Sequence, residues 1–120
     1  MKNEIPKGGV LLLYKPGGIT SHDAVAKVRR LYGTRSVGHT GTLDPMATGL
    51  LIMLVGKAVK ASDYVTAQDK IYDAEMKLGI MTDTADITGN ILSRSDDIPP
   101  RDEVISAAKS FVGRYMQVPP

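Results

Sequence analysis

The sequence predicts a mixed α/β or α+β fold on two observations. Apolar runs typical of strands alternate with segments of helical spacing along the 120 residues. The predicted strands are unevenly spaced, which fits a mixed architecture better than a regular doubly wound sheet. The length suffices for one domain, and 42% hydrophobic with 23% charged residues is ordinary for a globular protein.

The first half of the chain contains two predicted strands and a capped helix. Residues 9–14 form a continuous apolar run that ends in a Lys-Pro-Gly-Gly turn, which predicts a buried strand. Either Thr20 or Ser21 can cap the helix that follows, and Gly33 ends its pattern of helical spacing. Residues 50–55 are a second apolar run and predict a second buried strand.

The middle of the chain predicts a short helix and then a strand. Residues 57–65 have helical spacing. Residues 70–78 alternate in polarity, which predicts a strand with one mostly apolar face. The residues on that face are Tyr72, Ala74, Met76 and Leu78.

The last third of the chain is more polar. We expect a polar loop over residues 79–89, followed by a short strand over residues 90–93. A Pro-Pro step precedes a predicted helix over residues 102–112, and Gly113 closes it.

Charge is distributed unevenly along the chain. The net charge is only +2, but residues 1–60 hold most of the Lys and Arg, and residues 61–103 hold most of the Asp and Glu. This asymmetry predicts a basic face in the first half that could meet a polyanion. The alternative is an ordinary solvated helix face. The basic residues concerned are Lys27, Arg29, Arg30 and Arg35.

Several classes of site are excluded by composition. The chain has no cysteine, so disulfides, thiolate metal sites and cysteine nucleophiles are ruled out. Its two histidines, His22 and His39, are too few and too far apart to indicate a metal site. No segment approaches the length of a membrane span, and a cytoplasmic location is the default expectation.

The most informative segment is Gly38-His39-Thr40-Gly41-Thr42-Leu43-Asp44-Pro45-Met46-Ala47-Thr48-Gly49. It carries one carboxylate, Asp44, just before a proline that fixes the backbone, and it leads into an apolar run. A single charge on a stiffly held loop is typical of an active site. The alternative is a tight Gly/Pro turn that Asp44 merely caps. The segment lacks the Lys-Ser/Thr ending of a phosphate loop.

Five blocks in order resemble the N-terminal part of the catalytic domain of the bacterial TruB family of tRNA pseudouridine synthases. They are Gly9–Leu13 with Lys15-Pro16, Thr20–Asp23, Gly38–Gly49, Lys70-Ile71-Tyr72, and Leu78-Gly79 with Thr82–Asp86 and Gly89. This family isomerises a uridine in the T-loop of tRNA. Guide-RNA-dependent synthases share the Gly-His-Thr/Ser-Gly-Thr-Leu-Asp-Pro block, but the Thr82–Asp86 segment favours the stand-alone bacterial type.

The resemblance implies roles for matching residues, with tRNA as partner and without a cofactor or metal. Asp44 would be the catalytic nucleophile. The ring of Tyr72 would stack on the flipped uracil, and its hydroxyl could take part in proton transfer; a core aromatic is the alternative. The remaining implied substrate contacts are His39, which helps to hold the nucleotide out of the stack or else bonds its own loop, Thr42, Arg30, Arg35 and Lys15. For Lys15 the alternative is structural support of the site.

The resemblance also marks where this sequence departs from the family. The chain ends in Pro119-Pro120, before a Tyr-Ser-Ala-Lys-type block, before a Tyr-Ile-Arg-type block whose arginine pairs with the catalytic aspartate, and before the RNA-binding domain. We therefore expect residues 1–120 to be the N-terminal portion of a truncated pseudouridine synthase fold with a largely antiparallel sheet. Its unpaired strand edges would favour self-association. The alternative is a non-catalytic RNA-binding remnant, which the DNA downstream of the Pro120 codon would discriminate.

Overall fold

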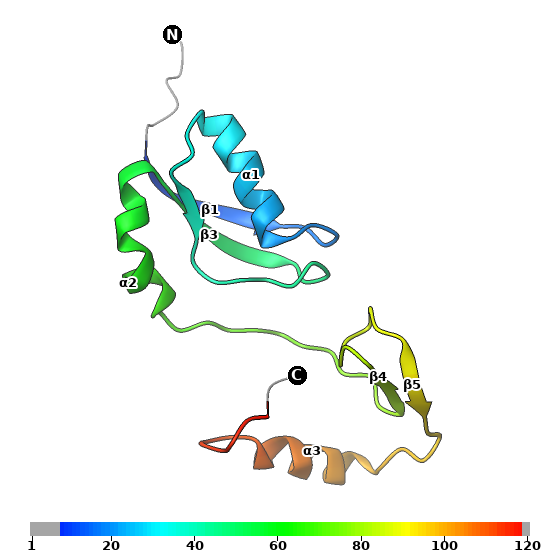
Figure 1. Ribbon diagram of the computed structural model, residues 1–120. Coiled ribbons are helices and arrows are strands. Elements are labelled where there is room, and N and C mark those ends of the chain that lie inside the picture. The colour runs from blue at the N-terminus through cyan, green and yellow to red at the C-terminus, as the bar shows by residue number, and fades with distance from the viewer. Residues whose placement is uncertain (1–7, 119–120) are drawn as a thin grey trace. The chain divides into compact units, whose positions relative to one another are not determined.

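The computed structural model describes residues 8–118, and the chain divides into two compact units, Met1–Ile71 and Tyr72–Pro120 (Figure 1). Each unit contains an antiparallel sheet and at least one helix. The predicted mixed α+β class is therefore confirmed.

The first unit is built on a three-stranded antiparallel sheet. Its strands are β1 (Gly9–Lys15), β2 (Val37–His39) and β3 (Gly49–Val55), in the order β1-β3-β2. Helix α1 (Ser21–Tyr32) lies along one face of this sheet (Figure 1). Successive side chains of a strand point to opposite faces, so every second residue of β1 and β3 faces α1.

The core of the first unit lies between α1 and the sheet. Antiparallel pairing sets Leu11 opposite Met53 and Leu13 opposite Leu51, and these side chains share the face that α1 covers. Burying this aliphatic layer is the main stabilising contribution to the unit. The fully buried members are Ala24, Val25, Val28, Val37, Leu51, Met53 and Val55.

Helix α1 begins and ends as its sequence predicts, and the structure decides between the two candidate caps. The Thr20 hydroxyl accepts a hydrogen bond from the Asp23 amide, and the Asp23 carboxylate accepts one from the Thr20 amide, which forms a capping box. Gly33 ends the helix in the left-handed conformation, with φ of 60°. Because Thr20 is the cap, Ser21 is left for another role.

The other face of the same sheet is open along β1 but covered at Leu54 of β3, which is 1% exposed. The β1 side chains Val10, Leu12 and Tyr14 are 61%, 67% and 71% exposed. Among the described residues β1 pairs only with β3, so its second edge has no partner strand. In the first unit, β1 therefore exposes apolar side chains and, among the described residues, an unpaired strand edge to solvent.

The chain continues through η1 (Gly56–Ala61), which is a 3-10 helix, and α2 (Ser62–Thr66). Together they confirm the short helix predicted for residues 57–65. In the second unit, β4 (Ile80–Thr82) and β5 (Ile91–Arg94) form an antiparallel hairpin, and α3 (Arg101–Ser110) follows.

The strand predicted for residues 70–78 is wrong. This segment is irregular, and residues 70–77 are exposed. Alternating polarity suits a strand, but a strand forms only where a neighbour completes its hydrogen-bond ladder, and no described strand pairs with this segment.

Three smaller expectations also need correction. The polar loop predicted for residues 79–89 contains strand β4. Helix α3 ends at Ser110 instead of residue 112, because the amides of Phe111 and Val112 bond three residues back and tighten the last turn. Strand β2 was not predicted, since three residues inside a glycine-rich motif give no periodic signal. Within residues 8–118, no helix is long and apolar enough to cross a bilayer.

Candidate active site

Asp44 lies in an exposed position on the loop that joins β2 to β3. Its carbonyl accepts a hydrogen bond from the Ala47 amide at 3.0 Å. This closes a four-residue turn with Pro45 in the second position, where the fixed φ of proline suits the turn. The Asp44 carboxylate takes part in none of the hydrogen bonds that hold this loop among residues 8–118. It is therefore free to meet another group.

Lys15 holds the backbone on the C-terminal side of Asp44. It ends β1 on the face toward α1 and is 0% exposed. Its ammonium donates to the carbonyls of Pro16 at 2.9 Å, Ile19 at 2.8 Å and Pro45 at 3.3 Å. An ammonium has three donors, and all three are used here, so in this structure Lys15 supports the loop and offers no free group to a substrate. The Gly18 amide donates to the same Pro45 carbonyl at 2.8 Å.

Ser21 holds the backbone on the N-terminal side of Asp44. Its hydroxyl donates to the Leu43 carbonyl at 3.1 Å and accepts from the Leu43 amide at 3.0 Å. The side chain is 3% exposed. Sequence reasoning considered Ser21 as a helix cap and as part of the Thr20–Asp23 block, but assigned it no contact with the Asp44 loop. One sequence feature could have indicated this contact: Thr20 alone suffices to cap α1, so the adjacent Ser21 hydroxyl is available for another partner.

His39, at the end of β2, is half-buried. Its ring nitrogen Nδ1 lies 2.6 Å from the Gly41 carbonyl, and because a carbonyl can only accept, Nδ1 carries the proton and donates. This is the alternative in which His39 bonds its own glycine loop. Gly41 has a φ of 115°, a conformation that favours glycine. A contact from His39 to a nucleotide stays a prediction, as does one from the exposed Thr42.

Tyr72 belongs to the second unit, where it lies in the irregular segment and is 63% exposed. The alternative that Tyr72 is a core aromatic is therefore wrong. Its proposed stacking on a base stays a prediction.

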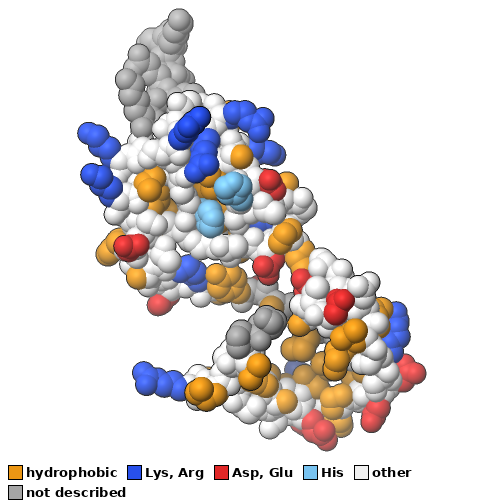
Figure 2. Space-filling model, viewed as in Figure 1, with side chains coloured by type: hydrophobic (Ala, Val, Ile, Leu, Met, Phe, Trp, Pro, Cys, Tyr) orange, Lys and Arg blue, Asp and Glu red, His pale blue; other side chains and the backbone are white. Residues whose placement is uncertain are grey.

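The basic residues of α1 do not share one role. The Arg29 guanidinium donates to the Val37 carbonyl at 3.2 Å and ties α1 to β2. Lys27 and Arg30 of α1, and Arg35 just beyond its end, are exposed like Arg29, but no hydrogen bond engages their charged groups within residues 8–118. Figure 2 shows Lys and Arg side chains at the surface of the first unit, with histidine side chains in the same view. Residues other than Arg29 are thus the better candidates for contact with a polyanion.

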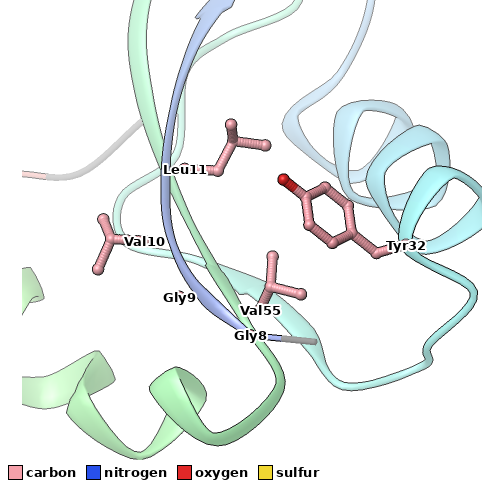
Figure 3. Close-up of a pocket in the computed structure, with 6 residues that line it drawn as sticks. All are labelled: Gly8, Gly9, Val10, Leu11, Tyr32 and Val55. Carbon is pink, nitrogen blue, oxygen red and sulfur yellow. The ribbon is translucent and has the colours of Figure 1, made fainter. Parts of the chain in front are cut away.

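One shallow hollow of the first unit lies away from Asp44. It has a volume of about 150 Å³ and is lined by Gly8–Leu11, Tyr32 and Val55. Figure 3 shows the Tyr32 ring reaching from α1 toward Leu11 at the start of β1. Lys15 ends the same strand, roughly 20 Å further along at 3.3 Å per residue. Among residues 8–118, no cluster of His, Cys, Asp or Glu could hold a metal ion.

Comparison of the whole sequence with known proteins shows which family this chain resembles. The family described as TruB family pseudouridylate synthase, N-terminal domain, matches residues 29–120. The match includes Asp44, Tyr72 and the whole glycine-rich motif of residues 38–49. A tRNA pseudouridine synthase B from Bacillus licheniformis is 50% identical over an alignment of 114 residues; the alignment covers 93% of this chain and 37% of the relative.

Other relatives agree in name and extent. The tRNA pseudouridine synthase B of Clostridium novyi is 48% identical over 112 residues and is covered to 39% of its length. This chain therefore spans less than two fifths of these relatives. One chain of a solved H/ACA RNP, bound to a substrate RNA containing 2'-deoxyuridine, aligns with 48% of this chain at 38% identity and a TM-score of 0.45.

Proposed function

Because this chain belongs to the TruB family of pseudouridylate synthases, we propose that it supplies the catalytic aspartate of a tRNA pseudouridine synthase that acts on a uridine of the T-loop. One observation carries this proposal. The Asp44 carboxylate is exposed on a loop in which the residues before and after it, Leu43 and Pro45, are each bonded through their backbone to the β1–α1 corner. A reactive group held in this way loses little further entropy when the substrate binds.

The chemistry of uridine isomerisation explains why one carboxylate can serve as the reactive group. Isomerising uridine breaks the bond from N1 to the ribose C1′, turns the uracil and forms a bond from C5 to C1′. The hydrogen on C5 leaves as a proton and N1 gains one, so no oxidant or cofactor is consumed. A carboxylate, ionised at neutral pH, can attack the sugar, attack the base or remove a sugar proton. Each route needs an ionised carboxylate within reach of the nucleotide.

The other site residues act on binding in this proposal. The target uridine lies in a folded loop and must leave its stack before Asp44 can reach it. The exposed Tyr72 ring stacks on the everted base, and His39 and Thr42 line its path. Arg30 and Arg35, both exposed, neutralise backbone phosphates of the T-arm.

The test measures release of tritium from unmodified tRNA that carries uridine tritiated at C5, since that hydrogen must leave. The isolated chain is compared with a chimera in which it replaces the matching segment of the 50% identical Bacillus licheniformis relative. We expect activity in the chimera that Asp44→Ala lowers by roughly a thousandfold or more. The control is Asp102→Ala, at an exposed carboxylate in the first turn of α3.

Each outcome of this comparison has a meaning. Full activity in the Asp44→Ala chimera would overturn the role of Asp44. An inactive isolated chain beside an active chimera would locate the activity in the longer enzyme and leave this chain as a binding module.

A further inference from the structure

Ser21 contacts the peptide before Asp44 in a way that helix capping does not require. It is the first residue of α1, yet its hydroxyl bonds both the carbonyl and the amide of Leu43, 22 residues away. A serine hydroxyl has one donor and free acceptor lone pairs, and both kinds are used on one residue. The result is a two-point contact equivalent to one rung of an antiparallel ladder.

The contact between Ser21 and Leu43 matters because the backbone on the C-terminal side of Asp44 is also bonded. Lys15 and Gly18 both donate to the Pro45 carbonyl, so the residue after Asp44 is already held. With Leu43 held by Ser21, both neighbours of Asp44 are bonded to the β1–α1 corner. Together these bonds restrain the backbone from which the Asp44 side chain projects.

We infer that Ser21 is a positioning residue for Asp44, acting through Leu43. This inference rests on the proposed function, because it gives Asp44 the task of meeting the nucleotide. Ser21 touches no reacting atom. It limits the directions that the carboxylate can take, and misplacement of a catalytic group by about 1 Å can cost on the order of a hundredfold in rate.

The adjacent hydroxyl provides a matched control. Thr20 caps α1 through Asp23 and makes no contact with Leu43. Thr20→Ala therefore weakens the same helix end and leaves the Leu43 contact in place. Ser21→Ala removes the contact and leaves the cap in place, whereas Ser21→Thr keeps a hydroxyl at the position.

The first readout is amide hydrogen exchange in this chain, which needs no activity. The Leu43 amide reports the contact directly, and the Ala47 amide, bonded to the Asp44 carbonyl, reports the turn that carries Asp44. In Ser21→Ala we expect both to exchange roughly tenfold faster relative to β3 amides, the loss expected for a pair of hydrogen bonds. We expect Ser21→Thr to restore slow exchange and Thr20→Ala to leave both ratios unchanged.

The second readout is turnover of tritiated tRNA by the active chimera. Ser21→Ala should lower kcat by roughly tenfold to a hundredfold with little change in KM, and Thr20→Ala should change neither. Unchanged exchange at Ala47, or unchanged kcat despite faster exchange, would overturn the positioning role of Ser21. Failure of the proposed function gives a different result: the Asp44→Ala chimera would then be as active as the parent chimera. The hydrogen-exchange measurement would still show whether Ser21 holds the turn.

Discussion

Lys15 carries a charge at a position with no exposed surface. Lysine is among the residues least often fully buried, so the sequence gives no reason to place it inside. What makes the position tolerable is a set of three carbonyls, one of them 30 residues away on the Asp44 loop. The Lys-Pro-Gly-Gly pattern predicted a turn at this position. It did not predict that the Lys15 ammonium would bond the loop that carries Asp44.

We expect Lys15→Met to lower the free energy of unfolding by about 2–4 kcal/mol, because buried carbonyls lose their donor. Urea denaturation followed by circular dichroism measures this change. The control is Lys27→Met, at an exposed lysine of α1, which should change stability by less than about 0.5 kcal/mol. If Lys15→Met were as stable as that control, the three carbonyl bonds would not support the loop.

Sequence reasoning located Asp44 and its stiff loop, because glycine and proline spacing is local information. It could not locate the contacts of Lys15 and Ser21. These join residues that are 30 and 22 positions apart, and they exist only once β1, α1 and the loop are folded together.

At the scale of elements, the β4–β5 hairpin is held by a carboxylate. Hydrogen bonds from the hydroxyls of Thr88 and Thr84, with the Thr88 amide, lower the pKa of Asp86 from its ordinary value of 3.8. A folded-state pKa below the unfolded one means that ionised Asp86 stabilises this turn at pH values above 3.8. That contribution is lost as the pH falls below 3.8 through the folded-state value.

Thr88→Val should raise the pKa of Asp86 toward 3.8, because the largest cause of the shift is removed. Carbon-detected NMR titration of the Asp86 carboxyl measures it. Thr82→Val is the matched control, since the Thr82 hydroxyl bonds only the backbone carbonyl of Asp86. A pKa that stays low in Thr88→Val would contradict this account of the hairpin.

Helices and strands could be predicted where their sequence signal is local. Prediction failed where an element depends on pairing with another segment. The capping residues fixed the ends of α1, and two apolar runs located β1 and β3. Residues 70–78 carry the alternation of a strand but lie in irregular backbone, because pairing is a property of two segments. The sequence of one segment cannot supply its partner.

At the scale of the whole molecule, β1 has one edge without a partner strand among residues 8–118, and its side chains Val10, Leu12 and Tyr14 are exposed. The strand lacks the devices that commonly protect edges: it has no proline and no bulge, and its one charge, Lys15, is buried. We therefore predict that the isolated chain self-associates through β1.

Sedimentation velocity over a range of concentrations tests this prediction. Leu12→Lys places a charge at the middle of the exposed face and should shift the chain toward monomer. Ile71→Lys makes the same change at a residue that is 99% exposed and outside the sheet, and it should leave association unchanged. A parent chain that is monomeric throughout would show that the free edge is harmless.

The central claim is that Asp44, held on a clamped loop, is the nucleophile of a tRNA pseudouridine synthase. The most direct measurement is tritium release from C5-labelled tRNA by the chimera and its Asp44→Ala variant. The account predicts release by the parent and a loss of roughly a thousandfold or more in the variant, with the Asp102→Ala control unaffected. Equal release by parent and Asp44→Ala would contradict it.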